Sequence, residues 1–255
     1  MVTKSVVKYV HSLSVKKYRD IEQCFVAEGP KVVTDLLPLM PCRILFATEA
    51  YFHTVDSGLL KAVEQVEIVS QAELERLSLL RSPRDAVAVF RRFSDALPAD
   101  VQRFPATSLC LALDDVQDPG NLGTILRVAD WFGIEHVFAS PGTADVYAPK
   151  VVQATMGAVG RVRIHYLDLT TFLQSLQTEI PVYGTFLDGK TIYDQPLSEN
   201  GIIIMGNEGK GISESVKKYV RNRLFIPNYP EGRNTSESLN VAIATAIVCA
   251  EFRRR

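Results

Sequence analysis

From residue 108 onward the chain alternates short apolar runs with segments of helical periodicity, and this alternation constrains the fold most strongly. Apolar runs such as 109–116 and 202–205 have the length of buried strands, whereas 121–132 has the period of a helix. Strands that alternate with helices are typical of a parallel sheet covered by helices on both faces. The pattern predicts further strands at 136–140, 162–166, 182–186 and 224–226, and further helices at 149–158, 170–177, 213–220 and 239–253.

The first 92 residues have a different pattern, in which helix-like and strand-like segments are mixed. Apolar residues recur at helical spacing between Val6 and Leu13, and 28–37 is predicted to be a second helix. Short β-branched or apolar runs predict strands at 43–47, 66–70 and 86–90. The polar stretch that follows contains a proline and has no clear period. We therefore predict a small α/β domain at 1–92, a linker at 93–107 and a larger α/β domain at 108–255.

The composition is that of an ordinary globular protein, with 47% hydrophobic residues, which excludes disorder of the whole chain. The net charge of −1 gives no indication of a nucleic-acid binder. No apolar run approaches the roughly 20 residues of a membrane span, and no signal peptide is recognisable. The cysteines form no C-x-x-C pair and are expected to be reduced thiols. We expect a cytoplasmic protein that has no membrane partner.

Several common functional motifs fail to match. Gly209-Lys210 is followed by Gly211 where a phosphate-binding Walker loop needs serine or threonine, and the Rossmann glycine spacing is missing before Gly123. No G-x-S-x-G sequence is present, which disfavours a hydrolase. The four histidines have no metal-ligand spacing, so no metal site is expected.

Three polar, glycine-rich segments follow predicted strands, where ligands bind in open parallel sheets. In the first, a Pro-Gly turn precedes Asn121, a candidate helix N-cap, and Arg127 follows less than two turns later. The second is 206–211, in which three glycines allow a ligand to approach the backbone closely. In the third, Ser238 and Asn240 flank the start of an alanine-rich helix. Each segment taken alone also fits a structural role as a cap or a turn.

Together the three segments resemble the motifs of the SpoU (TrmH-like) branch of the SPOUT RNA methyltransferases. The first is similar to N-x-G-x-I-x-R, the second to G-N-E-x-x-G, and the third to I-P followed later by S-L-N-V. The matching residues are Asn121, Gly123, Ile125 and Arg127, then Gly206, Asn207, Glu208 and Gly211, then Ile226, Pro227, Ser238, Leu239, Asn240 and Val241. Residues 150–157 also resemble a family segment, and 12–37 resembles a small L30e-like substrate-binding domain.

The resemblance implies an α/β catalytic domain with a C-terminal trefoil knot, S-adenosylmethionine as the cofactor, and a homodimer. It implies methyl transfer to a ribose 2′-hydroxyl of rRNA or tRNA, with rRNA slightly favoured and no DNA substrate. The implied catalytic residues are Asn121, Arg127, Glu208, Ser238 and Asn240. The implied cofactor-binding residues are Thr185, Phe186, Gly206, Asn207, Glu208, Gly209, Ile226, Pro227, Ser238 and Leu239. The loop between Gly232 and Ser238 departs from the family pattern, being longer by about two residues.

The resemblance gives Arg127 the central role. A guanidinium stays protonated and is a poor base, so we expect it to bind a phosphate and to stabilise developing alkoxide charge. Asn121 would orient Arg127, and Glu208 would bind Arg127 or a ribose hydroxyl. Ser238 and Asn240 would hold the RNA phosphate or Arg127. Two other functions stay open: an RNA-binding protein of this fold without catalysis, and a SPOUT enzyme that methylates a base.

Basic residues are unevenly distributed despite the neutral total. Their clustering predicts a basic path for RNA and salt-sensitive binding. The clusters are Lys4, Lys8, Lys16, Lys17 and Arg19; Arg81, Arg84, Arg91 and Arg92; Lys210, Lys217, Lys218, Arg221 and Arg223; and Arg253 to Arg255.

Overall fold

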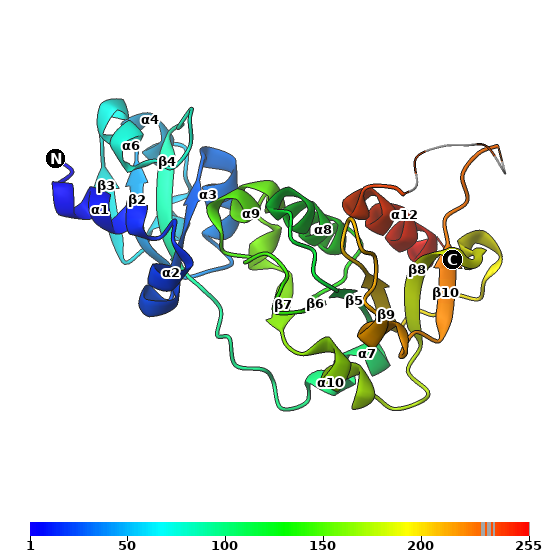
Figure 1. Cartoon of the computed structure of the whole chain (residues 1–255). Coiled ribbons are helices and arrows are strands. Elements are labelled where there is room, and N and C mark those ends of the chain that lie inside the picture. Colours follow the sequence, from blue (N-terminus) through cyan, green and yellow to red (C-terminus); the bar gives the residue numbers. More distant parts are fainter. Residues whose placement is uncertain (231–232, 234–235, 237, 255) are drawn as a thin grey trace. The chain divides into compact units, whose positions relative to one another are not determined.

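The computed structural model describes residues 1–230, 233, 236 and 238–254, and Figure 1 shows the order of its elements. The chain forms two compact units. The first contains Met1–Ser94 and Asp145–Arg161, and the second contains Asp95–Ala144 and Val162–Arg255. Residues 145–161 follow the sixth strand of the chain, yet they pack with the N-terminal residues. The division into 1–92, 93–107 and 108–255 stays a sequence-based prediction.

The second unit is built on a six-stranded sheet whose strands all run parallel. The prediction of a parallel sheet is therefore confirmed. The strand order is β10-β8-β9-β5-β6-β7. The strands are β5 (Leu109–Leu113), β6 (His136–Ala139), β7 (Arg163–Tyr166), β8 (Val182–Thr191), β9 (Gly201–Met205) and β10 (Asn222–Phe225).

Helices lie on both faces of this sheet (Figure 1). On one face α8 (Pro119–Trp131) and α12 (Val241–Arg253) pack against each other. On the other face α10 (Leu169–Gln174) and α11 (Glu214–Lys217) cover a core that includes Ile202, Ile204 and Phe172. Because the strands are covered on both faces, residues 109–113 and 201–205 are buried without alternation, as their continuous apolar sequence predicts.

The predicted linker contains regular structure: a 3₁₀ turn at Val101–Arg103 and the short helix α7 (Phe104–Thr107). The ring of Phe104 stacks on His136, with 3.8 Å between centroids and 4° between planes. Nδ1 of His136 lies 3.1 Å from Nε2 of His165 on the neighbouring strand. Burial, and after it the charge of His136, lowers the pKa of His165 to about 4. These rings join the predicted linker to the edge of the sheet.

Two helix starts differ from the sequence-based expectation. The helix expected at 121–132 begins at Pro119, because Asp118 is its N-cap. The side chain of Asp118 accepts a hydrogen bond from the backbone amide of Asn121 at 2.8 Å. The expectation that Asn121 caps this helix is wrong, and Asn121 lies in its first turn. The last helix begins at Val241 instead of residue 239, since Asn240 caps it.

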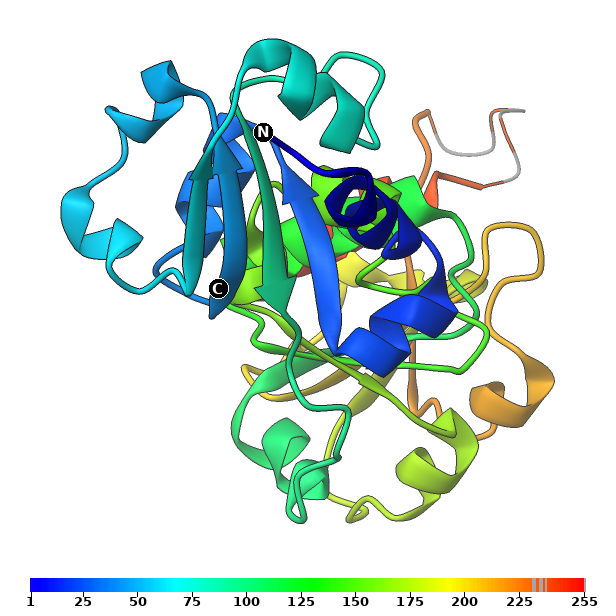
Figure 2. The same cartoon turned by 90° about the vertical axis from the view of Figure 1, so that its left-hand side faces the viewer.

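The first unit is built on a four-stranded sheet of order β1-β4-β2-β3, which Figure 2 shows nearly face-on. The central strand β4 (Ala86–Arg91) is antiparallel to its neighbours β1 (Cys24–Glu28) and β2 (Cys42–Ala47), whereas β3 (Gln65–Ile68) is parallel to β2. The sequence did not predict β1, α2 (Lys16–Glu22) or α6 (Gln71–Leu77). The helix expected at 28–37 is α3 (Pro30–Leu36), because Glu28 ends β1 and Gly29 turns the chain with φ 88°.

The first unit also contains the longer helix α1 (Lys4–Ser12) and two short helices, α4 (Glu49–Phe52) and α5 (Ser57–Leu60). The segment that arrives from the second half of the chain contributes α9 (Pro149–Thr155), which packs on β1. Tyr147 in this segment contacts Phe25, with ring centroids 4.8 Å apart. The segment therefore packs against the side of β1 that carries Phe25.

Candidate active site

Side chains from the three predicted motifs meet beyond the ends of the strands in the second unit. The Asn121 side-chain amide donates a hydrogen bond to Oε1 of Glu208 at 2.8 Å. The side-chain amide of Asn240 donates to Oδ1 of Asn121 at 2.9 Å. A continuous chain of hydrogen bonds thus connects the loop after β9, the first turn of α8 and the start of α12.

Asn240 can make this contact because it uses both ends of its amide. Its Oδ1 accepts hydrogen bonds from the backbone amides of Ala242 at 2.9 Å and Ile243 at 3.3 Å, which caps α12. Its Nδ2 remains as a donor to Asn121. Aspartate or serine would cap a helix equally well, but neither has a side-chain NH₂ group. The geometry therefore accounts for asparagine at this position.

The glycine-rich loop after β9 is held by Asn207. Its Oδ1 accepts from the backbone amides of Gly209 and Lys210, both at 3.0 Å. The backbones of Asn207 and Gly211 exchange hydrogen bonds of 3.0 and 2.9 Å, with Gly211 at φ 68°. A Cβ at Gly206 would lie 2.2 Å from the carbonyl carbon of Gly211, so no other residue fits there. The loop is a defined turn that presents Glu208.

Two acidic residues at the end of β5 support this loop, and the sequence reasoning did not identify them. The carbonyl oxygen of Asp115 accepts from Nδ2 of Asn207 at 2.8 Å. Oδ2 of Asp114, which is 6% exposed, accepts from the backbone amide of Ser213 at 2.7 Å. The sequence feature that could have identified them is a pair of adjacent aspartates directly after an apolar strand. Asp115 also has φ 59°, a conformation that a non-glycine residue rarely adopts.

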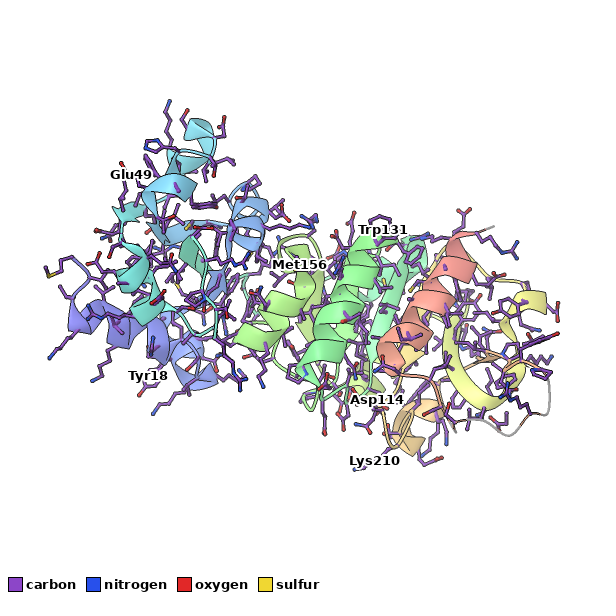
Figure 3. The ribbon with its side chains drawn as sticks, turned by 90° about the horizontal axis from the view of Figure 1, so that it is seen from above. Tyr18, Glu49, Asp114, Trp131, Met156 and Lys210 are labelled. Carbon is purple, nitrogen blue, oxygen red and sulfur yellow. The ribbon has the colours of Figure 1, made fainter. Side chains whose placement is uncertain are left out.

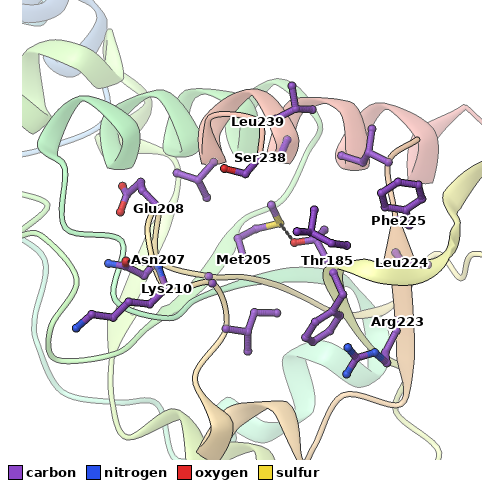
Figure 4. Close-up of a pocket in the computed structure, with 18 of the residues that line it drawn as sticks. Thr185, Met205, Asn207, Glu208, Lys210, Arg223, Leu224, Phe225, Ser238 and Leu239 are labelled. Carbon is purple, nitrogen blue, oxygen red and sulfur yellow. Dashed lines mark hydrogen bonds between the residues drawn. The ribbon is translucent and has the colours of Figure 1, made fainter. Parts of the chain in front are cut away.

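A cavity of about 470 Å³ lies beside the hydrogen-bonded chain, and Figure 4 shows its walls. Every predicted cofactor-binding residue except Pro227 lines it. Lining residues that the sequence did not predict include Asp188, Lys210, Lys217 and Arg223. The lining residues named here come from β8 (Thr185, Phe186, Asp188), the loop after β9 (Gly206 to Lys210), α11 (Lys217), β10 and the residue after it (Arg223, Ile226) and the start of α12 (Ser238, Leu239).

The wall formed by β8 and β10 carries a charged pair. The guanidinium of Arg223 lies 3.7 Å from the ring centroid of Phe186 and forms an ion pair with Asp188. Hydrogen bonding from Arg223 lowers the pKa of Asp188. Asp188 is therefore ionised at neutral pH, and the guanidinium of Arg223 lies against the ring of Phe186 at the cavity wall. Met205, Leu224 and Phe225 add apolar surface.

These residues fit S-adenosylmethionine. The volume lies within the range of pockets for ligands of this size, and the wall combines apolar side chains with exposed glycine backbone. Glu208 and Asp188 place carboxylates at the cavity, which suit a cationic ligand. Among the residues that the structure describes, no three His, Cys, Asp or Glu side chains gather where they would bind a metal ion.

Arg127 lies apart from this cluster. It is exposed on α8, and the described part of the chain gives it no hydrogen-bond or ion-pair partner. Six residues are about one and two-thirds turns, so Arg127 and Asn121 occupy different faces of the helix. Arg127 instead shares a face with Trp131, one turn later. The expected contacts of Arg127 with Asn121 and Glu208 are absent within the described residues, because those two residues bond to each other.

Ser238 lines the cavity and is exposed. The longer loop that the sequence places between Gly232 and Ser238 lies outside the described residues, apart from 233, 236 and 238. Within the described ranges, no helix is both long and apolar enough to cross a membrane.

A family model described as the SpoU rRNA Methylase family matches residues 108–250, more than half of the chain. The chain belongs to the SpoU family. A second model, the MRM3-like substrate binding domain, matches residues 4–88. Both matches confirm the family resemblance and the small α/β domain expected ahead of the catalytic one. The segment that matches the SpoU model contains Glu208, Asn121 and Asn240, the three residues joined by side-chain hydrogen bonds.

Relatives of this SpoU protein align over nearly its whole length. The 23S rRNA (guanosine(2553)-2′-O)-methyltransferase RlmP of Bacillus subtilis is 30% identical over 97% of this chain and 95% of its own. A putative RNA methyltransferase of the TrmH family from Porphyromonas gingivalis has a structure with TM-score 0.85 and 43% identity, covering 100% of this chain and 99% of that one. An AdoMet-bound rRNA methyltransferase from Sinorhizobium meliloti has TM-score 0.80 and 27% identity, covering 100% and 96%.

The structure corrects part of the predicted basic path. Arg19 is buried against carbonyl oxygens and Asp145, and the side chain of Arg92 is only 4% exposed. Arg91 pairs with Glu64, and Lys217 pairs with Glu214. A charge count along the sequence cannot distinguish buried, paired guanidinium groups from exposed cations, so Arg19 and Arg92 are not available as phosphate contacts.

Proposed function

We propose that this protein transfers a methyl group from S-adenosylmethionine to a ribose 2′-hydroxyl of rRNA. The observation that carries the proposal is the hydrogen-bonded chain Glu208–Asn121–Asn240 beside the cavity. It joins residues of three separate motifs at the edge of a pocket of cofactor size. The substrate class is supported by the RlmP relative, which is named as acting on 23S rRNA, and by the Sinorhizobium meliloti rRNA methyltransferase.

Glu208 is the group we assign to the ribose hydroxyl. One of its carboxylate oxygens accepts from Asn121, and Glu208 is exposed at the loop, so its other oxygen is accessible to a substrate. A carboxylate that accepts a hydrogen bond from the 2′-hydroxyl makes that oxygen more nucleophilic. Asn121, fixed by Asn240, prevents Glu208 from rotating away. S-adenosylmethionine, when bound, supplies an electrophilic methyl group, so the residues act mainly by positioning.

Arg127 is assigned to the RNA phosphate beside the target ribose. Its guanidinium remains cationic and can bind a phosphate through two parallel hydrogen bonds. It can also stabilise negative charge that develops on the 2′-oxygen. Ser238 at the cavity has a hydroxyl that can donate to the same phosphate. The lack of an internal partner for Arg127 in the described residues leaves it available for this contact.

We also propose a homodimer that forms through α8 and α12. Trp131 is 85% exposed at the end of α8, and Ile243 is 53% exposed on α12. The two helices pack against each other. Exposed large apolar side chains on adjacent helices favour a protein interface. Arg127 lies on the same face as Trp131, so a partner subunit on this face would lie next to Arg127. We also propose that the second unit contains the trefoil knot and that the protein is cytoplasmic.

The test is methyl incorporation into rRNA and tRNA, each isolated from cells that lack this gene, with radiolabelled S-adenosylmethionine. We expect label in rRNA, and alkaline hydrolysis should leave it in a dinucleotide, because a 2′-O-methyl blocks cleavage at that linkage. Label released in mononucleotides would indicate base methylation. RNA binding without any incorporation would indicate a binding protein.

A further inference from the structure

The short helix α2 of the first unit exposes an unusual combination of side chains. Tyr18 is 44% exposed and Ile21 is 64% exposed, and Lys17 is exposed beside them. Tyr18 and Ile21 are three residues apart and Lys17 and Ile21 are four apart, so the three side chains are neighbours on one helix face. Figure 3 shows Tyr18 at the outer edge of α2. We call this face, Lys17, Tyr18 and Ile21, the α2 platform.

The opposite side of α2 is anchored by a buried guanidinium. Arg19 is 2% exposed, and its Nη1 donates to the carbonyl oxygens of Leu13 and Ser14, both at 2.8 Å. Its Nη2 forms an ion pair with Asp145 at 2.6 Å. Burying a guanidinium is costly unless such partners compensate it, so these contacts fix the position of α2 closely.

A second set of contacts holds the middle of the helix. Asp20 accepts from Nζ of Lys16 at 2.9 Å and from Nη1 of Arg92 at 2.7 Å. Arg92 also donates from Nε to the side chain of Gln23 at 3.2 Å, just after the helix ends. The seven residues of α2 are therefore tied to the unit at several points. The exposed face is presented on a rigid support, and its apolar side chains are not explained by packing.

We propose that the α2 platform binds an unpaired RNA base, with the base stacked on Tyr18, its edge against Ile21 and a neighbouring phosphate at Lys17. The inference rests on the proposed function, because it assigns part of the RNA substrate to the first unit. Proteins that bind single-stranded RNA stack bases on exposed aromatic rings and place basic side chains along the backbone. In the described part of the chain, Lys17 has no acidic partner and is free to bind a phosphate.

RNA fits this surface better than a protein does. A stable protein interface needs roughly 20 to 30 residues a side, whereas the platform has one ring and one aliphatic chain. Lysine is depleted from the cores of protein interfaces but contributes directly to phosphate binding. A rigid aromatic ring next to an unpaired ammonium group matches the chemistry of a nucleotide. Paired RNA is excluded because its bases are stacked inside the helix.

The test uses the full-length chain and a single-stranded RNA oligonucleotide that contains 2-aminopurine, whose fluorescence is quenched when it stacks. The variants are Tyr18→Phe, which keeps the ring, and Tyr18→Leu, which removes it. Ile68→Ala is the matched control, because Ile68 is 54% exposed on β3 of the same unit. We expect Tyr18→Leu to weaken binding about 10-fold and to lose quenching. Tyr18→Phe and Ile68→Ala should bind as the wild type does.

With rRNA as substrate, Tyr18→Leu should raise KM for RNA and leave kcat and the affinity for S-adenosylmethionine unchanged. Lys17→Ala should reduce the slope of log K against log salt by about 0.7. The proposal is overturned if the wild type shows no quenching, or if Tyr18→Leu binds the oligonucleotide like the wild type. It is also overturned if Tyr18→Leu changes the oligomeric state, since the surface would then bind protein. Quenching that depends on Tyr18, without ribose methylation, would refute the proposed function but would still support RNA binding by the α2 platform.

Discussion

The carboxylate of Glu208 accepts a hydrogen bond from the side-chain amide of Asn121 at 2.8 Å. Asn121 in turn accepts from Asn240, the residue that caps α12. The central asparagine is therefore both donor and acceptor, and its orientation is fixed from two sides. A change at Asn121 would disturb both neighbours, because neither Glu208 nor Asn240 has another side-chain partner within the described residues.

The hydrogen bond between Glu208 and Asn121 predicts strong energetic coupling of these two residues in methyl transfer. Glu208→Ala and Asn121→Ala should each lower kcat/KM about 10- to 100-fold, because a hydrogen bond to a charged group contributes about 1.5–3 kcal/mol. The double variant should be only slightly worse than either single variant, since both changes break the same bond. The measurement is a double-mutant cycle on methyl transfer, and additive losses would contradict the account.

The glycine loop predicts a contrast between two similar substitutions. In Gly206→Ala the new Cβ would lie 2.2 Å from the backbone of Gly211, whereas in Gly209→Ala the nearest atom is 3.8 Å away. Gly206→Ala should lower the free energy of unfolding by about 1–3 kcal/mol and abolish binding of S-adenosylmethionine. Gly209→Ala should leave both nearly unchanged. Denaturant unfolding and calorimetry test the pair, and equal effects would argue against a rigid loop.

The exposed apolar face predicts the assembly. Trp131→Glu should convert the protein from twice the chain mass to the chain mass, because a carboxylate cannot be buried at the centre of an apolar interface. Ile68→Glu, on the edge strand of the first unit, is the control and should leave the mass unchanged. Light scattering after gel filtration measures both. A wild-type protein with the mass of one chain would refute the dimer.

The histidine pair predicts a pH dependence of stability. The pKa of His165 in the folded protein, about 4, lies below its usual value, so the unfolded chain binds the proton more readily. Stability should be full above about pH 6.5 and should decrease as the pH falls toward 4. Between pH 7 and pH 5 the free energy of unfolding of the wild type should fall more than that of His165→Gln. Urea unfolding at both pH values tests this, and equal losses would contradict it.

The sequence predicted the second unit better than the first, for a physical reason. Strands of a parallel sheet are buried on both faces and leave continuous apolar runs such as 201–205, which stand out between helices. The strand β1 is also fully buried, but its five residues directly precede another helix and have no alternation. A short apolar run of this kind fits a strand or a buried helix equally well. Only the pairing with β4 decides between the two.

The candidate site could be assembled from motifs, but its connections could not. Asn121 was expected to cap a helix and to orient Arg127, because local spacing cannot show that Asp118 caps more favourably. The support that Asp114 and Asp115 give the glycine loop depends on contacts across almost a hundred residues. The burial of Arg19 is likewise invisible to a charge count. Long-range partners decide the role of each of these residues.

The most direct test of the central claim is mass-spectrometric mapping of ribose methylation in rRNA and tRNA from a strain that lacks this gene. We predict that one 2′-O-methyl group disappears from rRNA. A plasmid with the wild-type gene should restore it, and one with Arg127→Ala should not, although that variant should still bind S-adenosylmethionine. An unchanged set of ribose methyl groups in the deletion strain, or full restoration by Arg127→Ala, would contradict the account.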